Sequence, residues 1–571
     1  MVYCLADNVT SPLGTTTEAN YEALVGGQSA LQRYEGRWHL AEPFVASLFG
    51  SEQETALATP GLTRFESLVV ASARRAVAQS GIDVTTSRVA LVIGSTKGNI
   101  DCLVDGEEPS QDYYMGDTAQ HIAAALGMTT QPIVACNACI SGVSAIVVAM
   151  RLLDAGYYDY AVVCGADVQS KFTVAGFQAL KAVSAQPCRP FDMERLGLNL
   201  GEAAATMVLC SHRVAPRDRA LWAIEGGAVR NDAFHVSSPS KNGEGARLAL
   251  CATRAAEIAD ELACINAHGT ATMFNDQMES VAIERAGLNA VPVNALKGYY
   301  GHTMGAAGVL ETVMTMHGID HATVLGTRGF EERGVSGKIT LSPDHQPTAR
   351  DSFVKMISGF GGSNAALLMS KTPKLQHAEQ ALPGFVVTHR VTMLPGSLTV
   401  DGKSVDVACD GGEWLTAVYK QCMGNYPKFY KMDMLSRLAL VASDVLLQEE
   451  GGARFEPCDS RAVVLFNHSS SRQADSDFLA TIARDDECFP SPSLFVYTLP
   501  NMAVAEVAMR NQYHGETSLY LLPGRDDDTM RNIVRASLLD AGTTSMITGW
   551  IDFEDNDHFV ADLYIIEKRI D

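Results

Sequence analysis

The stretch PIVACNACISGVSAIVVAMRLLDAG, residues 132–156, joins a short apolar run to a longer one through a turn of small residues. The first run has the length and composition of a buried strand, whereas the second places apolar residues at helical spacing and ends at Gly156. Cys139 therefore lies where a strand turns into a helix. Because backbone N–H groups and the positive end of a helix dipole favour a thiolate at such a position, we expect Cys139 to be an activated nucleophile.

The spacing of Cys136 and Cys139 also fits a redox or metal-binding Cys-x-x-C pair. A structural zinc site needs four ligands, usually from a second such pair or from two histidines, and the chain has no second Cys-x-x-C. A thioredoxin-type pair needs its first thiol exposed at a helix start, but Cys136 falls on the strand side of the turn. We therefore interpret Cys136 as a packing residue. Taken alone, Cys139 is also consistent with a buried structural cysteine.

Length and composition indicate a large globular protein. The chain has 571 residues, 47% apolar and 19% charged, so we expect at least two structural units. Its 13 cysteines stand mostly in apolar segments and are expected to be reduced thiols. A net charge of -22 argues against a general nucleic-acid binder. The sequence has no signal-peptide pattern and no run of about 18 apolar residues, so we expect a cytoplasmic protein without a membrane span.

The order of strands and helices predicts an α/β fold with a repeat. The first 370 residues alternate β-branched apolar runs with amphipathic stretches, and the polar segment 370–384 is expected to be a linker. Beyond it, LVAS followed by SRAVVLFNHSSS echoes VVAS followed by SRVALVIGSTKG, and LLDAG recurs. Alignment of the two LLDAG segments places Arg525 where Cys139 stands in the first copy. The second copy is therefore expected to lack the nucleophile.

Three further stretches carry residues of the types that support a nucleophile. His268 ends the apolar run in INAHGTATMFND, and ALKGYYGHTMGAAGVLE contains Lys297, His302 and Glu311. Phe360 lies in the glycine turn of ISGFGGSNAALL. Separately each is a weak signal, because a histidine beside a glycine most often has a structural role, and a glycine turn usually serves only the backbone.

Together and in this order, these stretches and NACISG resemble the β-ketoacyl synthases, the condensing enzymes of fatty acid and polyketide synthesis. NVTSPLG and CRPFDMERLGLNLGEAAATMVL resemble further motifs of that family, and the resemblance covers roughly residues 1–371. It implies a thiolase-like five-layer α/β/α/β/α fold made of two pseudo-repeated halves, residues 1–215 and 216–371. Residues 385–571 resemble an additional, degenerate α/β half-thiolase-like domain.

The resemblance implies a decarboxylative Claisen condensation of an acyl thioester with malonyl-acyl carrier protein. Cys139 would be acylated, and His268 and His302 would be the paired active-site histidines. Neutral imidazoles suit this role, because each offers one N–H to the enolate oxygen while loss of carbon dioxide replaces proton abstraction from carbon.

Other residues would support the reaction. Lys297 paired with Glu311 would orient the histidine loop, and Phe360 would be the gating aromatic residue whose backbone N–H, with that of Cys139, stabilises an oxyanion. The sequence departs from the family pattern in two places. Asn137 stands where threonine is common, and GEAAA replaces GEGAG. These departures put the pocket shape and substrate preference in doubt.

The resemblance also implies partners. We expect no bound metal or redox cofactor, substrates carried on the phosphopantetheine of an acyl carrier protein, and docking of that partner on a local Lys/Arg patch. A homodimer is the family's usual state. The unit 385–571 is expected to be noncatalytic, and either to pack on the catalytic unit or to bind a further ketosynthase-like partner. His514 in YHGET is expected at the surface.

Two alternatives remain. A thiolase-like acyl-CoA enzyme would need a further cysteine near the final glycine turn, which reads SGFGGSNA. A noncatalytic chain-length-determining partner subunit should have lost the nucleophile, whereas Cys139, His268 and His302 are all present.

Overall fold

The first sheet of the protein has a mixed topology and carries the turn that leads to Cys139. The computed structural model describes residues 1–216, 220–376, 381–409, 413–452, 454–483 and 489–569. The central strands of the sheet are parallel and the last two are antiparallel to their neighbours. In spatial order the strands are β5 (Ile133–Ala135), β4 (Val89–Gly94), β6 (Tyr160–Asp167), β8 (Ala203–Ser211) and β1 (Val2–Thr10).

Helices cover both faces of this sheet. On β4, Val89, Leu91 and Ile93 pack with one set of helices, whereas Ala90 and Val92 pack on the opposite side, as the alternation of a buried strand requires. The outer helices are α3 (Arg64–Ser80) and α4 (Met115–Leu126), and the inner ones are α5 (Ser141–Asp154) and α10 (Ala307–Asp320).

A second sheet packs against the other side of α5 and α10. Its strands are β9 (Trp222–Asn231), β16 (Ser363–Ser370), β15 (Ser352–Gly359), β10 (Leu262–Asn266), β11 (Pro292–Asn294) and β13 (Thr340–Leu341). Its outer face is covered by α7 (Glu244–Ala252) and α8 (Met273–Arg285). Twelve of the fourteen residues of α5 are buried, because sheets lie on both of its sides. This arrangement confirms the predicted five-layer α/β/α/β/α fold.

The boundaries proposed for the three units stay predictions. The two sheets also touch directly, because the first residues of β1 pair with the first residues of β9. Part of the predicted linker, residues 377–380, lies outside the described residues.

The C-terminal unit repeats the topology of the first sheet. Its strands follow the same spatial order with the same directions, and they are β21 (Thr517–Leu521), β20 (Arg461–Asn467), β22 (Ser545–Phe553), β23 (Phe559–Lys568) and β17 (Phe385–Leu394). Helices α12 (Met434–Glu450), α15 (Met502–Asn511) and α16 (Asp527–Ser537) take the places of α3, α4 and α5. The echoes seen in the sequence thus correspond to equivalent elements.

The comparison of α5 with α16 shows that the C-terminal unit corresponds to only one half of the two-sheet catalytic unit. Six of the eleven residues of α16 are buried, and its other side carries exposed charges such as Asp528 and Arg531. Among the described residues of the C-terminal unit, no second sheet covers that side. Arg525 precedes α16 by two residues, as Cys139 precedes α5, and its guanidinium pairs with Asp562 at 2.9 Å.

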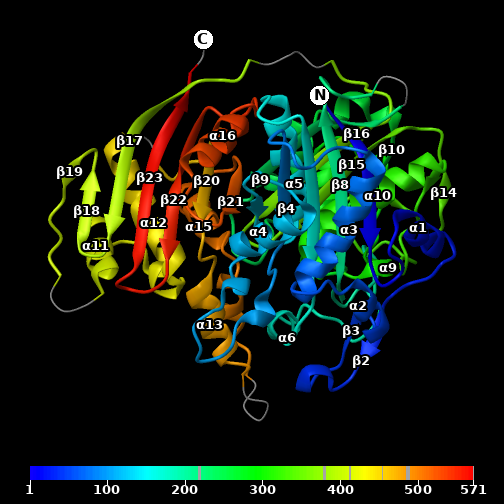
Figure 1. The fold of residues 1–571 in the computed structure, drawn as a ribbon, viewed down its shortest axis with the longest axis horizontal. Coiled ribbons are helices and arrows are strands. Elements are labelled where there is room, and N and C mark those ends of the chain that lie inside the picture. Colours follow the sequence, from blue (N-terminus) through cyan, green and yellow to red (C-terminus); the bar gives the residue numbers. More distant parts are fainter. Residues whose placement is uncertain (217–219, 377–380, 410–412, 453, 484–488, 570–571) are drawn as a thin grey trace.

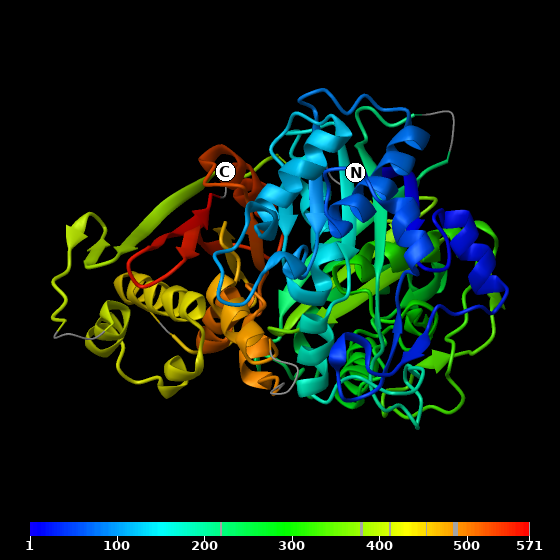
Figure 2. The same cartoon turned by 60° about the horizontal axis from the view of Figure 1, so that its bottom comes forward.

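The two units join edge to edge through equivalent strands. β21 pairs antiparallel with β5, so that Tyr520 faces Ala135 and Leu521 faces Val134. Pairing of the same strand from two copies is the mark of a two-fold interface, here a pseudo-two-fold within one chain. Figures 1 and 2 show the orange and red C-terminal unit lying beside the cyan strands and helices of the first unit.

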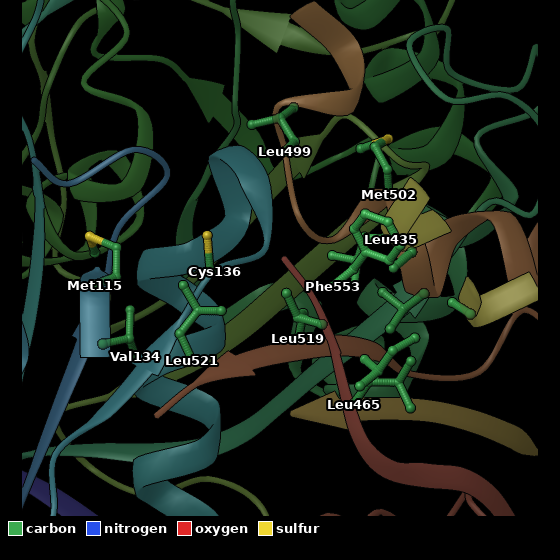
Figure 3. Packing of buried hydrophobic residues seen from close by; sticks show 14 of the residues in the cluster. Met115, Val134, Cys136, Leu435, Leu465, Leu499, Met502, Leu519, Leu521 and Phe553 are labelled. Carbon is green, nitrogen blue, oxygen red and sulfur yellow. The ribbon is translucent and has the colours of Figure 1, made fainter. Parts of the chain in front are cut away.

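Apolar side chains fill the junction on both sides of the joined sheet. Met115, Val134 and Cys136 of the first unit lie beside Leu519 and Leu521 of the C-terminal unit (Figure 3). One buried cluster contains Met115, Val134, Cys136, Leu519 and Leu521 and continues into α12 and α15. The two units therefore share a continuous core.

Buried charges also cross the junction. Lys97 donates to Asp475 at 2.6 Å and to the carbonyl of Thr498, and Tyr113 donates to the same carboxylate at 2.7 Å. His514 lies in the same interface, buried beside the backbone of Asn231, so the expectation of a surface position is wrong. The segment around His514 therefore contributes to the contact between the two units.

Among the described residues, no helix is both long and apolar enough to cross a membrane.

The pair formed by Lys97 and Asp475 gives a test of the interface. Asp475→Ala is expected to lower the free energy of unfolding by about 3–5 kcal/mol, because it leaves the Lys97 ammonium buried without its carboxylate. The double variant Lys97→Met, Asp475→Leu should recover most of that loss. Urea unfolding measures both. Glu35→Ala, which breaks an exposed pair with Arg33, is the control and should change stability by about 0–1 kcal/mol; an equally small effect of Asp475→Ala would contradict the prediction.

Candidate active site

A strained turn presents Cys139. The residue lies in the short 3₁₀ turn Ala138–Ile140 between β5 and α5, where the sequence predicted it. Ala138 has a φ of +48°, a left-handed conformation that costs a non-glycine residue free energy. The hydroxyl of Thr96 donates to the Ala138 carbonyl at 3.1 Å and holds the turn in this shape.

Each histidine is fixed through its own backbone. His268 follows β10, and its N–H donates to Glu279 on α8 at 2.7 Å. His302 follows a glycine, Gly301, with a φ of +67°, and its N–H donates to the carbonyl of Asn199 at 2.6 Å. Loops of two different elements thus bring the rings to one point.

The three predicted residues meet in the structure. One ligand-type atom from each of Cys139, His268 and His302 lies within 4.8 Å of the other two. The two rings stand nearly perpendicular, with centroids 4.8 Å apart and an interplanar angle of 83°. All three side chains are buried, so their interactions are little screened by water.

The histidines are neutral donors. His302 Nδ1 accepts from the N–H of Met304 at 3.2 Å, so the ring proton lies on Nε2. That Nε2, like Nδ1 of His268, is buried without a hydrogen-bond partner among the described residues. Burial, and then the nearby Lys297, lower the pKa of both imidazoles well below the ordinary histidine value. A buried neutral N–H without a partner is ready to bind a substrate oxygen.

Burial also favours the neutral form of the Cys139 thiol. Burial raises its pKa to about 12, although Lys297 and hydrogen bonds from the backbone N–H groups of Cys139 and Phe360 act in the opposite direction. Burial therefore opposes the thiolate that the helix start was expected to favour, so the thiol has to lose its proton as it reacts. The two N–H groups still converge on the sulfur, where an oxyanion of a thioester adduct would form.

Lys297 and Glu311 form the predicted pair. Lys297 Nζ donates to Glu311 at 2.7 Å and to the carbonyl of His268 at 2.6 Å, which ties the pair to the histidine loop. The sequence prediction missed Lys355, whose Nζ donates to the other oxygen of Glu311 at 2.5 Å. Burial lowers the pKa of Lys355 to about 8. Its signal was a lone lysine inside the apolar strand SFVKMISG.

Asp167 was missed as well. Its carboxylate accepts from Ser95 Oγ at 2.8 Å, from the N–H of Thr96 at 3.0 Å and from the N–H of Gly305 at 2.7 Å. It therefore links the loop that supports the Cys139 turn to the loop that follows His302. The terminal aspartate of the strand YAVVCGAD was the signal.

A cavity of about 360 Å³ opens from the three residues toward the surface. Its mouth exposes Leu196, Met273 and Phe274, so it is mainly apolar. Among the described residues that line it, Lys181 is the one Lys or Arg side chain. The predicted basic docking patch does not line this cavity.

The C-terminal unit forms the wall behind Phe360. Phe360 stacks on Phe177 at 5.9 Å, and Phe177 packs edge-on against Phe495 of the C-terminal unit at 5.3 Å. The Phe495 ring lies so close to Gly176 that a Cβ there would be 2.1 Å from it. Asn501 Nδ2 donates to the Phe360 carbonyl at 3.1 Å. The position of Phe360 thus depends on both units.

Asn137, the departure from the family pattern, has a structural reason. Its side-chain oxygen accepts from the N–H of Leu519 at 2.7 Å, and the N–H of Cys136 donates to the Leu519 carbonyl at 3.1 Å. The residues before the nucleophile are therefore held by β21 of the C-terminal unit.

Alkylation of Cys139 by iodoacetamide tests the neutral resting thiol. Because the thiolate is the reacting form and burial raises the pKa to about 12, the rate constant is expected to rise about tenfold per pH unit from about pH 7 to 10. Mass spectrometry of the labelled peptide gives the rate, with Cys139→Ala as the blank. A plateau already at neutral pH would show an ionised sulfur instead.

Two family models match consecutive parts of the chain. The beta-ketoacyl synthase N-terminal domain model matches residues 5–215 and the C-terminal domain model residues 221–331, together more than half of the chain. The tetracenomycin polyketide synthase ketoacyl synthase alpha subunit of Streptomyces glaucescens is 30% identical over 408 residues, 64% of this chain and 95% of that protein. The 3-oxoacyl-(acyl-carrier-protein) synthase 2 of Vibrio cholerae is 28% identical over 63% of this chain and 96% of that protein.

Solved structures extend the likeness. A beta-ketoacyl synthase from Burkholderia phymatum superposes with a TM-score of 0.60 at 25% identity, covering 65% of this chain and 99% of that one. The PfaC keto synthase-chain length factor structure superposes with a TM-score of 0.73 at 14% identity, covering 99% of this chain and 78% of that one, and shows a shared fold. The domain models and the Streptomyces relative together show that the chain belongs to the β-ketoacyl synthase family.

Proposed function

We propose that this protein catalyses the decarboxylative Claisen condensation of an acyl thioester with malonyl-acyl carrier protein, through an acyl-Cys139 intermediate. The observation that carries the proposal is the buried meeting of one thiol with two neutral imidazoles that have unpartnered nitrogens. The names of the Vibrio and Streptomyces relatives place them in the same class of acyltransferases.

In the first half-reaction the sulfur of Cys139 attacks the carbonyl carbon of the acyl thioester. A new C–S bond forms, the C–S bond to the carrier breaks, and the thiol proton passes to the departing thiolate. With a thiol pKa of about 12, this proton has to leave as the bond forms, and a neutral imidazole within 4.8 Å can accept and return it. The N–H groups of Cys139 and Phe360 stabilise the oxyanion.

In the second half-reaction the malonyl C–C bond to the carboxylate breaks, carbon dioxide leaves, and the electron pair of that bond becomes the enolate. The enolate carbon attacks the acyl carbon, a C–C bond forms, and the C–S bond to Cys139 breaks. The released thiolate takes up one proton from solvent, which restores the resting enzyme. His302 Nε2–H and the proton of His268 stabilise the enolate oxygen. Lys297, Lys355 and Glu311 hold the His268 loop and need not touch substrate.

The substrates would arrive on the phosphopantetheine of an acyl carrier protein, as the name of the Vibrio relative suggests. The bonds made and broken balance without a redox cofactor or a metal ion. The apolar mouth of the cavity, with Leu196, Met273 and Phe274, favours a pantetheine arm over a highly charged ligand. The cytoplasm as the place of the reaction remains a prediction.

The alternatives are less well supported by the site. A thiolase-like reaction lacks its additional cysteine, because the turn from Ser358 to Asn364 contains none. A noncatalytic chain-length-determining subunit would not need Cys139, the paired histidines and a cavity that connects them to the surface.

The unit 385–571 is proposed to replace the second subunit of a homodimer. The edge of β5 is already occupied by β21. This edge is the one through which the two pseudo-symmetric units contact each other. Arg525 stands at the position of the nucleophile, so this unit cannot be acylated there. A further ketosynthase-like partner on this unit would have to use another face.

Intact mass spectrometry after incubation with acyl-acyl carrier protein tests the reaction. The native protein is expected to gain one acyl group and Cys139→Ala none. His302→Gln should still be acylated but condense about 100- to 1000-fold more slowly, because it loses a donor to the enolate oxygen. His268→Gln should condense similarly slowly and should also be acylated more slowly, because the lone pair of His302 is already engaged by Met304 and His268 is the imidazole that can accept the thiol proton. His235→Gln changes a histidine that lines the same cavity outside the trio and is the control. Condensation at the native rate by both trio variants would refute the proposed roles.

Sedimentation velocity tests the single-chain arrangement. We expect a species with the mass of one chain at micromolar concentration, since the strand edge used by the pseudo-two-fold is no longer available. A species of two chains that persists on dilution would contradict this arrangement and would support the homodimer predicted from the sequence.

A further inference from the structure

A group of metal-ligand side chains lies outside the active site, where helix α1 (Thr17–Val25) meets the end of α10. Glu18 of α1 and His317 and His321 at the end of α10 each place a ligand-type atom within 4.8 Å of the other two. None of the three lines the catalytic cavity. We propose that these side chains bind a divalent transition-metal ion, with Zn²⁺ as the best match to two imidazoles and a carboxylate.

The distances suit such an ion. Glu18 Oε2 and His317 Nε2 are 3.0 Å apart. Two ligands at about 2.0–2.1 Å from a tetrahedral zinc ion lie about 3.3 Å apart, so a shift of a few tenths of an ångström would admit the ion. His317 and His321 are four residues apart, the spacing that places two imidazoles on one face of a helix.

The hydrogen bonding of His321 leaves a nitrogen free to ligate. Its Nδ1 lies 2.9 Å from the carbonyl of His317, which can only accept, so Nδ1 carries the proton and Nε2 the lone pair. An imidazole that donates its second N–H to a backbone carbonyl is the usual form of a metal-ligating histidine.

Tyr21 holds both rings in place. It is buried, and its ring stacks on His321 at 4.5 Å and meets His317 edge-on at 5.0 Å. Both imidazole rings thus pack against the buried ring of Tyr21, which lowers the entropy cost of fixing them around an ion.

The local field favours a cation. The site lies at the C-terminal end of α10, the negative end of the helix dipole. Asp7 interacts electrostatically with His317 and accepts from Thr17 at 2.7 Å, whereas the charge of nearby Asp320 is paired with Lys371 at 2.6 Å. A bound ion would tie α1 to α10, the helix whose Glu311 holds the two active-site lysines.

A simple ion pair between His317 and Glu18 is the competing interpretation. His558 forms such a simple pair with Asp555 at 2.9 Å. Among the described residues, this pair has no third potential metal ligand close to it. The second histidine, His321, which directly follows the last residue of α10, distinguishes the proposed site. The trio of Cys139, His268 and His302 is also within ligand distance, so the test must remove it.

Titration of the Cys139→Ala protein with Co²⁺ alone, followed by visible absorption, tests the proposal. We expect one equivalent to bind with d–d bands and without a thiolate-to-metal charge-transfer band, and Zn²⁺ to displace it. His321→Ala and Glu18→Gln should each weaken binding at least tenfold, and His317→Ala should abolish it. His558→Ala is the matched control and should bind as before.

Equal Co²⁺ binding by all four variants, or a thiolate band, would overturn the proposal, because the ion would then occupy another site or cysteine ligands. Absence of binding by the parent protein would also overturn it. Since His321 and Glu18 are exposed, their variants are not expected to unfold, and circular dichroism of each variant checks this.

Discussion

The antiparallel pairing of β5 with β21 is the contact on which the site depends. β5 leads directly into the turn that presents Cys139, and its edge would be open without the C-terminal unit. Leu519 fixes the backbone of Cys136 and the side chain of Asn137. Without this pairing the N–H and C=O groups along the β5 edge would lose their partners, so the C-terminal unit stabilises the strand that leads to Cys139.

Burial decides the protonation states at the centre. The same desolvation that keeps His268 and His302 neutral also keeps the Cys139 thiol protonated. Charge is instead concentrated one layer away, where Glu311 accepts from both Lys297 and Lys355. The reacting groups are thus neutral and shielded from water, whereas the charged Lys297, Lys355 and Glu311 hold the surrounding loops in place.

The C-terminal unit has only one sheet, and the sequence of its helix α16 reflects this. An α5-like helix between two sheets has to be apolar all round, whereas α16 has lost one sheet and is amphipathic. The nucleophile position carries Arg525, which forms ion pairs near the surface. What this unit retains is the edge strand β21 and the contacts of Phe495 and Asn501 with the Phe360 side of the cavity.

The sequence alone determined the strand-to-helix turn at Cys139 and the internal repeat, because local periodicity is written along the chain. The five-layer fold and the trio of Cys139, His268 and His302 followed from the resemblance of its ordered motifs to the β-ketoacyl synthases. The sequence did not determine that the repeat closes the β5 edge, that Lys355 and Asp167 support the loops, or that His514 is buried. It also did not show how strongly burial would oppose ionisation of Cys139. Those features depend on which segments, hundreds of residues apart, come into contact and exclude water, and only the tertiary structure decides that.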